Sequence, residues 1–292
     1  MDRMTTSRFS DFTGFFDDAA IFPPGSAELP DAVRAHLQRR SASIQPLVGP
    51  LLLTEARLSE AAALATEVAG ELGIDLAREP LRVGLVVAPG ALDQALRVAA
   101  EPPQGVVISG LELKTDQRWR EQLAAGVELA QDAPYSVHVE LSGDAVAEGG
   151  VKELAGTAAR LKYRTGGLEA TLFPSVAQLA SVIDAAAQAE VPFKLTAGLH
   201  QAVRHTGPKT GFQHHGFLNI ALATAAARSG ADFDRVQRLL AERDHDAVRA
   251  AYAETSASWR TLFESFGTCS ISEPIESLIA LDLLDPALLS TT

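Results

Sequence analysis

Cysteine is almost absent from this chain of 292 residues. The single thiol, Cys269, excludes an internal disulfide and a zinc-binding thiolate cluster, which is typical of proteins in a reducing compartment. No run approaches the roughly 18 apolar residues of a membrane span. The N-terminal stretch MDRMTTSRFSDFTGFF lacks the apolar core and cleavage site of a signal peptide. We therefore expect a cytoplasmic protein that does not bind a membrane.

Basic residues are scarce relative to acidic ones. The chain has 25 Lys and Arg against 37 Asp and Glu, a formal net charge of −12. Because phosphate backbones are held by clustered Lys and Arg, this balance argues against a nucleic-acid partner. A hydrophobic share of 47% at this length supports a large core. We predict a single domain over residues 1–292 that binds a small molecule, with a homo-oligomer left open.

What the chain does contain is a regular alternation of short β-branched runs and longer Ala- and Leu-rich stretches of helical period. This alternation is typical of parallel βαβ units. Strands are expected near residues 16–22, 44–53, 81–87, 106–114, 136–141, 161–165, 192–196 and 265–269. Helices are expected near residues 32–39, 55–72, 91–99, 117–129, 151–159, 176–187, 217–229, 233–263 and 274–284. The pattern predicts an α/β fold, a (β/α)8 TIM barrel with a helical insertion between strands 7 and 8.

Charged side chains share one face on four consecutive expected strands. Residues two apart on a strand point the same way, and the carboxyl ends of barrel strands carry the active site. A structural salt bridge explains any single pair equally well. Four adjacent polar strand ends are a costly way to fill a core, which favours a functional site. The pairs are Glu112 with Lys114, His138 with Glu140, Lys162 with Arg164, and Lys194 with Thr196.

The two lysines stand out because each precedes a glycine-containing turn. Lys162 lies in LKYRTGG and Lys194 in FKLTAGLHQAVR, on strands expected to be neighbours. An adjacent cation and partial burial both disfavour a protonated amine. A neutral amine attacks carbonyl carbons, as Schiff-base catalysis requires.

This part of the chain resembles the deoxyribose-phosphate aldolase family and its class I aldolase relatives. The matching stretches are Lys162–Gly166, Phe193–Gly198 and Phe266–Ser270, in the order and spacing of the family's last three strands. They lie within about 130 C-terminal residues. The resemblance implies a lyase in which Lys162 forms the Schiff base and Lys194 lowers its pKa. It implies proton transfer by an acidic residue, for which Glu112 is the nearest candidate and Glu140 and His138 compete.

Departures from the family pattern concern the substrate. Arg164 stands where the family has a small residue, and Arg204 comes later than the family's arginine. Arginine binds carboxylate as well as phosphate, so an anionic carbonyl compound without phosphate is equally compatible. No cofactor is expected. The substrate contacts are expected from Arg164, Gly166, Gly167, Thr196, Gly198, His200, Arg204, His214, His215, Gly267, Thr268 and Ser270.

Two other functions fit the same residues. One is a metal-dependent hydrolase, isomerase or lyase that uses His138, Glu140 and the loop histidines His205, His214 and His215, although their spacing matches no established ligand motif. The other is a non-catalytic barrel that binds a small anion. Asp17 or Asp18 on the first strand is placed to reach the site or to stabilise an N-terminal turn. Cys269 has no evident base partner in the sequence and is interpreted as a small packed residue.

Overall fold

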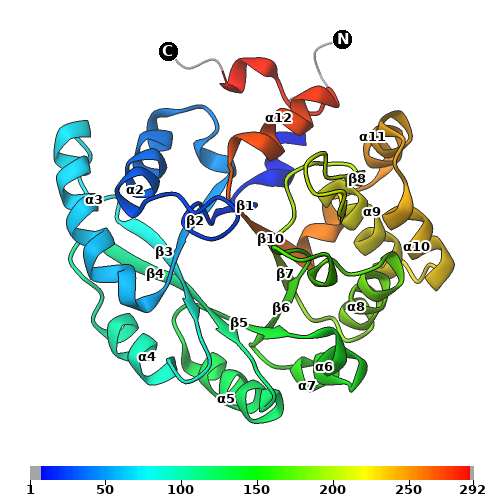
Figure 1. Cartoon of the computed structure of the whole chain (residues 1–292), viewed down its shortest axis with the longest axis horizontal. Coiled ribbons are helices and arrows are strands. Elements are labelled where there is room, and N and C mark those ends of the chain that lie inside the picture. The colour runs from blue at the N-terminus through cyan, green and yellow to red at the C-terminus, as the bar shows by residue number, and fades with distance from the viewer. Residues whose placement is uncertain (1–7, 290–292) are drawn as a thin grey trace.

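Eight parallel strands close into a barrel surrounded by helices in the computed structural model, which describes residues 8–289 (Figure 1). The barrel order is β1-β10-β7-β6-β5-β4-β3-β2. This confirms the predicted (β/α)8 fold class. Residues 1–7, on which the signal-peptide argument partly depends, lie outside the described range. The barrel strands are β1 (Phe16–Asp18), β2 (Val48–Leu53), β3 (Leu81–Val87), β4 (Val106–Lys114), β5 (Ser136–Leu141), β6 (Arg160–Arg164), β7 (Phe193–Thr196) and β10 (Phe263–Thr268).

Helices connect the strands and form the outer layer (Figure 1). Apolar residues alternate with polar ones on the strands, so Leu111 and Leu113 of β4 pack outward in the shell while Glu112 points inward. The α-helices are α2 (Leu29–Gln38), α3 (Leu58–Leu72), α4 (Leu92–Ala100), α5 (Trp119–Asp132), α6 (Gly143–Ala147), α7 (Gly150–Leu154), α8 (Val176–Gln188), α9 (Phe217–Arg228), α10 (Phe233–Ala241), α11 (His245–Glu254) and α12 (Ser272–Ala280).

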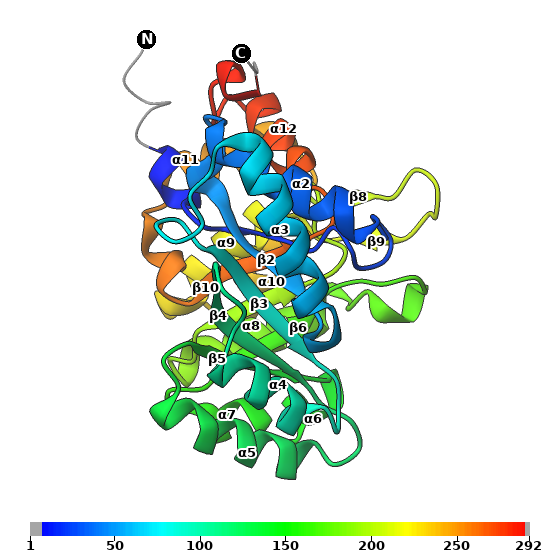
Figure 2. The ribbon, with the colours of Figure 1, turned by 90° about the vertical axis from the view of Figure 1, so that its left-hand side faces the viewer.

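A small hairpin and three helices lie between β7 and β10. The hairpin pairs β8 (His205–Thr206) with β9 (Gln213–His214), and α9, α10 and α11 follow it. Figure 2 shows the hairpin projecting from the same end of the barrel as the green loop after β6. The two segments touch, since the Phe173 ring lies 5.3 Å from Phe212 and 4.6 Å from His214. Together they form one wall at the carboxyl ends of the strands.

Local backbone chemistry explains where the predicted bounds differ from the structure. The helix expected over residues 151–159 is the shorter α7, which ends at Leu154, two residues before Gly156 with its left-handed φ of 72°. The separate helix α6 precedes it, and Gly149 between the two is also left-handed, with φ of 94°. The first strand ends at Asp18 rather than residue 22, and the chain then turns through a cis Pro23–Pro24 bond. Strands β3, β4 and β5 match the predicted bounds.

One helical stretch, Ala170–Gln188, is long and apolar enough to span a membrane by length and composition. It consists of a short 3-10 helix, Ala170–Leu172, followed by α8. Leu179, Val182 and Ile183 of α8 are buried in the apolar shell between the helices and the barrel. The rest of the stretch is mostly not buried, since 28% of its apolar window lies inside the protein.

Candidate functional site

A chain of buried charges occupies the axis of the barrel. The Nζ atom of Lys162 lies 2.8 Å from Glu112 Oε2 and 2.8 Å from Glu140 Oε2. The Nζ atom of Lys194 lies 2.5 Å from Asp17 Oδ2 and also contacts Glu112 Oε1. Glu112 therefore bridges both ammonium groups. Asp17, Glu112, Lys162 and Lys194 are each at most 3% exposed.

Strand register brings these residues together. Glu140 pairs with Lys162 across β5 and β6, and Lys162 pairs with Lys194 across β6 and β7. All of them take the inward positions of strands whose alternate residues are apolar. Asp17 joins from β1, the strand on the other side of β10. The prediction that four adjacent strands present polar faces to the barrel interior is correct.

The two lysines nevertheless face different ends of the barrel. Lys162 lines a cavity of about 380 Å³ at the carboxyl ends of the strands, together with Arg164 and Thr196. Lys194 lines a separate cavity of about 170 Å³ at the amino ends, together with Arg82 and Ser136. Barrel strands tilt relative to the axis, so residues paired in register lie at different heights along it. We call these the upper and the lower cavity.

Neither lysine has a lowered pKa, so the prediction of a lowered pKa for Lys162 is wrong. Burial alone would lower the pKa of Lys162, but the charges of Glu112 and Glu140 outweigh it, and the pKa is raised from 10.5. The pKa of Lys194 is raised in the same way, because Asp17 and Glu112 outweigh burial. Both amines are therefore ammonium ions at neutral pH.

The pKa values of the carboxylates Glu112 and Glu140 are shifted downward, opposite to those of the lysines. Burial would raise the pKa of Glu112, but Lys162 and Lys194 outweigh it and hold the pKa well below its usual range. The pKa of Glu140 is also lowered, since Lys162 and Arg164 outweigh burial. Glu112 and Glu140 are thus ionised acceptors beside Lys162, positioned to take its proton.

Cationic groups surround the opening of the upper cavity. Arg164 donates to Glu140 Oε1 from Nε at 3.2 Å, and Lys114 lines the same cavity, in which Glu169 is the acidic lining residue. Burial lowers the pKa of the half-buried Lys114. This lining suits a small anionic ligand better than a neutral one. The predicted site residues that line the upper cavity are Lys162, Arg164, Gly167, Thr196, Gly198, His200 and Gly267.

Three other residues predicted to contact the substrate do not line this cavity but shape the loops around it: Gly166, Thr268 and Ser270. A Cβ atom on Gly166 would come within 2.7 Å of Gly198 Cα, so a glycine is required where the loops after β6 and β7 meet. Thr268 Oγ1 donates to the carbonyl of Ser270 at 2.9 Å, which closes the turn before α12. Ser270 Oγ lies 3.4 Å from the backbone nitrogen of Glu273 at the start of α12.

The loop residues Arg204, His214 and His215 hold the hairpin in place. His215 donates from Nε2 to the carbonyl of Pro174 at 2.8 Å, and Arg204 donates to its Nδ1 at 3.0 Å. Burial lowers the pKa of His215 to about 4, so its ring is neutral near pH 7. His214 donates from Nδ1 to the carbonyl of Gly198 at 3.0 Å. None of these three residues lines the upper cavity in the described structure.

His138 lies with the lower cavity, although it was expected beside Glu140 at the active rim. Its Nε2 lies 3.3 Å from Glu264 Oε2, and Arg160 binds the same carboxylate at 2.9 Å. The structure thus separates His138 from the loop histidines. Among residues 8–289, no group of three or more His, Cys, Asp or Glu side chains is arranged to hold a metal ion. The metal-dependent alternative therefore lacks the ligand set on which it depended.

Sequence reasoning missed three partners of the predicted residues. Asp17 binds Lys194 from a position 177 residues away, and Glu264 binds His138. The interpretation of Cys269 as lacking a base partner is wrong, because His200 Nε2 lies 3.8 Å from its Sγ. Each partner belongs to a strand or loop that is distant in sequence. The spacing of residues around the predicted positions therefore does not indicate the contact.

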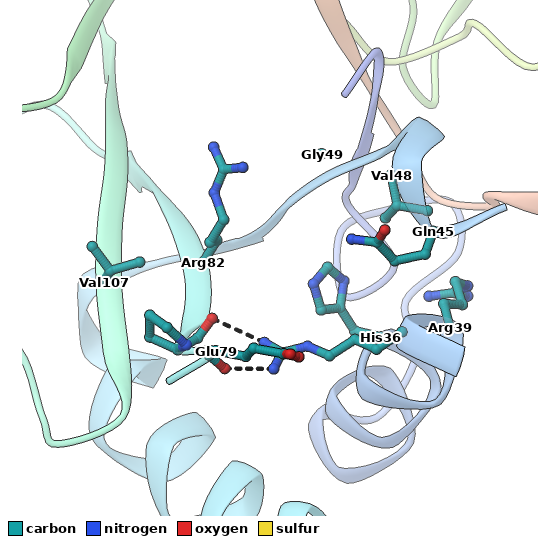
Figure 3. Close-up of a pocket in the computed structure, with 10 residues that line it drawn as sticks. His36, Arg39, Gln45, Val48, Gly49, Glu79, Arg82 and Val107 are labelled. Carbon is teal, nitrogen blue, oxygen red and sulfur yellow. Dashed lines mark hydrogen bonds between the residues drawn. The ribbon is translucent and has the colours of Figure 1, made fainter. Parts of the chain in front are cut away.

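A further cavity of about 460 Å³ lies at the amino ends of β2 and β3, where Figure 3 shows Arg82 on one side and His36 with Gln45 on the other. Its other arginines are engaged within the protein. Arg39 donates to Asp18 at 2.8 Å, and Arg40 donates to the carbonyl of Pro80 at 2.9 Å. None of the predicted catalytic residues lines this cavity, which is therefore separate from the candidate site.

Comparison with known protein families finds no family that matches this chain, and a search of curated proteins finds no matching relative. The candidate site thus rests on the fold and on the geometry described above.

Proposed function

We propose that this barrel is a lyase of the class I aldolase type, which forms a Schiff base between Lys162 and a small anionic carbonyl compound. The observation that carries the proposal is the position of Lys162, whose amine borders the upper cavity with two carboxylates 2.8 Å away. A barrel with polar groups at the carboxyl ends of its strands is the usual setting for such chemistry. Arg164 and Lys114 supply the positive charge that an anionic substrate requires.

The resting ammonium form of Lys162 requires a proton transfer before the amine can react. Glu140 takes a proton from Lys162 Nζ, and the free amine adds to the carbonyl carbon to form a carbinolamine. The protonated Glu140 then returns the proton to the hydroxyl group, which leaves as water as the imine forms. Lys194 has no part in this step, because it binds Asp17 and Glu112 on the side of the lower cavity.

Reductive trapping tests the proposal. The full-length chain is incubated with pyruvate or dihydroxyacetone phosphate and sodium borohydride, which represent carboxylated and phosphorylated carbonyl compounds. Peptide mass spectrometry is expected to place the reduced adduct on Lys162. Lys162→Ala is expected to remove this adduct, and Lys152→Ala, an exposed lysine of α7, serves as the matched control. Adducts spread over exposed lysines, with none on Lys162, would refute the mechanism.

The raised pKa of Lys162 sets the pH dependence of the trapping rate. Proton transfer from Lys162 to Glu140 runs against their shifted pKa values, so little neutral amine forms near pH 7. Since only the neutral amine reacts, the trapping rate at Lys162 is expected to keep rising with pH past 10.5, the ordinary lysine value. The measurement is the initial rate of adduct formation at fixed carbonyl concentration between pH 6 and about 11. A rate that levels off near neutrality would mean that the pKa of Lys162 is lowered, contrary to its pairing with Glu112 and Glu140.

Binding of a small anion without turnover is the second candidate function. The observation that favours it is that Lys162 and Lys194 are both fully paired and charged, as structural cations would be. A saturable increase in Tm with pyruvate or phosphate, together with no adduct on Lys162 at any pH, would favour binding over catalysis.

A further inference from the structure

Cys269 lies at the upper cavity within a row of three interacting side chains. Its Sγ atom is 3.8 Å from His200 Nε2, and His200 Nδ1 is 2.8 Å from Glu273 Oε2. Cys269 directly follows β10, His200 follows β7, and Glu273 lies in the first turn of α12. Both Cys269 and His200 line the upper cavity, so a ligand in that cavity has access to the thiol.

The hydrogen bonds define the form of the imidazole. Glu273 accepts the proton on His200 Nδ1, which leaves the lone pair on Nε2 directed at the thiol of Cys269. Burial lowers the pKa of His200 despite the opposing charge of Glu273, so the ring is neutral near pH 7. Burial raises the pKa of Cys269, so the sulfur is a thiol at rest. A neutral base beside a protonated nucleophile, oriented by a carboxylate, is the arrangement of hydrolase triads.

The loop after β1 is fitted closely around the sulfur. The backbone N–H of Gly25 acts on the Cys269 thiol and favours its thiolate, although burial outweighs this effect and raises the pKa. A Cβ atom on Gly25 would lie 2.7 Å from Cys269 Cβ, so only glycine allows this approach. The other ionisable groups that act on the pair are Asp18 of β1 and His214 of β9. The thiol is thus held on one side by backbone and is open on the side of the cavity.

We propose that Cys269, His200 and Glu273 form a second nucleophilic centre on the wall of the upper cavity, which accepts the acyl group of a small ester or thioester. The cationic lining formed by Lys114 and Arg164 favours an acyl group that carries an anion. This centre does not depend on Schiff-base formation at Lys162.

The chemistry of this centre balances without a cofactor. The thiol proton moves to His200 Nε2 as the Cys269 sulfur forms a bond to the acyl carbon, and the bond from that carbon to the leaving oxygen or sulfur breaks. His200 gives the proton to the leaving group. Water then attacks the acyl-cysteine and loses a proton to His200, which returns it to the departing thiolate. The products are the acid and the alcohol or thiol released in the first step, and the Cys269 thiol is regenerated.

The experiment uses the full chain and two probes. 4-Nitrophenyl acetate is the acyl donor, and mass spectrometry of the quenched protein reports acetylation of Cys269. Iodoacetamide measures the reactivity of the thiol itself at pH 7. Wild-type protein is expected to carry acetyl on Cys269 and to lose its free thiol to iodoacetamide at least tenfold faster than the His200→Ala variant.

Controls separate activation from access and folding. Glu273→Gln is expected to slow alkylation less than His200→Ala does, because it keeps the shape of the side chain and removes only the charge that orients His200. Glu276→Gln changes an exposed carboxylate on the same helix and is expected to leave the rate unchanged. Circular dichroism checks that each variant is folded. An unchanged or faster alkylation in folded His200→Ala protein, or no acetyl on Cys269, would overturn the proposal. Trapping at Lys162 is detected on a different peptide, so the two proposals fail independently.

Discussion

Glu112 is the residue on which the buried charges of the barrel depend. Its two oxygens each contact a different lysine, so one carboxylate serves two ammonium groups. Lys162 also contacts Glu140, and Lys194 also contacts Asp17. Removing the charge of Glu112 therefore leaves two buried ammonium ions, each with one fewer partner. Losing a partner destabilises the folded state strongly, because a buried ammonium ion has no water to solvate it in place of the carboxylate.

Glu112→Gln is expected to lower the free energy of unfolding by about 3–5 kcal/mol, the usual range for removing one partner of a buried pair. Urea unfolding followed by circular dichroism measures the change. Glu121→Gln is the matched control, because Glu121 pairs with Arg118 on the surface, where both side chains are more than half exposed. The control is expected to have no measurable effect. Equal effects of the two substitutions would show that the charges at Glu112 are not paired as described.

At the scale of single residues, the sequence predicted which charged side chains face the barrel interior. It did not predict which of them form ion pairs. The alternation on β4 to β7 placed Glu112, Lys162 and Lys194 inside the barrel, which the structure confirms. It also suggested that the two lysines would repel each other. That repulsion is outweighed, because Asp17 and Glu112 pair with Lys194. The partner contributed by β1, Asp17, carries no signal in the sequence around Lys194.

At the scale of elements, the short strand β1 depends on close packing against its neighbour β2 to hold Asp17 in place. β1 has only three residues, and Asp17 at its centre points inward to Lys194. On the neighbouring β2, a Cβ atom on Gly49 would lie 2.0 Å from Asp17 Oδ1. The carboxylate of Asp17 thus occupies the space that any other residue at position 49 would need. The glycine is required for the ion pair as much as for the strand.

Gly49→Ala is expected to destabilise the protein by about 1–3 kcal/mol, the cost of overpacking a filled interior. Gly70→Ala serves as the control, because Gly70 lies within α3 and an added Cβ meets no atom within 4 Å. The control is expected to stabilise the protein by about 0.5–1 kcal/mol through the higher helix propensity of alanine. Unfolding midpoints in urea measure both. A neutral Gly49→Ala variant would contradict the close packing of Asp17 against β2.

At the scale of the whole molecule, the distribution of charge is uneven. The chain carries a net charge of −12, yet cations line the opening of the upper cavity and ammonium groups occupy the axis. The buried pairs make stability depend on pH in a direction that the pKa shifts determine. Glu112 and Glu140 have lowered pKa values, so they stabilise the fold above their ordinary value of 4.5. Lys162 and Lys194 have raised pKa values, so they stabilise it below 10.5.

We therefore expect Tm to be highest between about pH 4.5 and 10.5 and to fall on both sides of this window. On the acid side, stabilisation by Glu112 and Glu140 is lost as pH falls toward their lowered pKa values. Asp17 opposes this loss in part, because burial raises its pKa despite Lys194, and its protonation favours the folded state. Differential scanning fluorimetry from pH 3 to about 11 tests the window. A maximum confined to acid pH would mean that the lysines are not paired with carboxylates.

The sequence by itself determined the order of strands, the side chains that point inward and the chemical groups available to a site. These follow from periodicity, because alternation along a strand decides face without reference to any other strand. The tertiary structure decided the height of each charge along the barrel axis. Strand tilt places Lys162 at the upper cavity and Lys194 at the lower one. The adjacency of β7 and β10 brings His200 to Cys269. Closure of the barrel sets these distances, because the contacting residues belong to strands and loops that meet only when the sheet is complete.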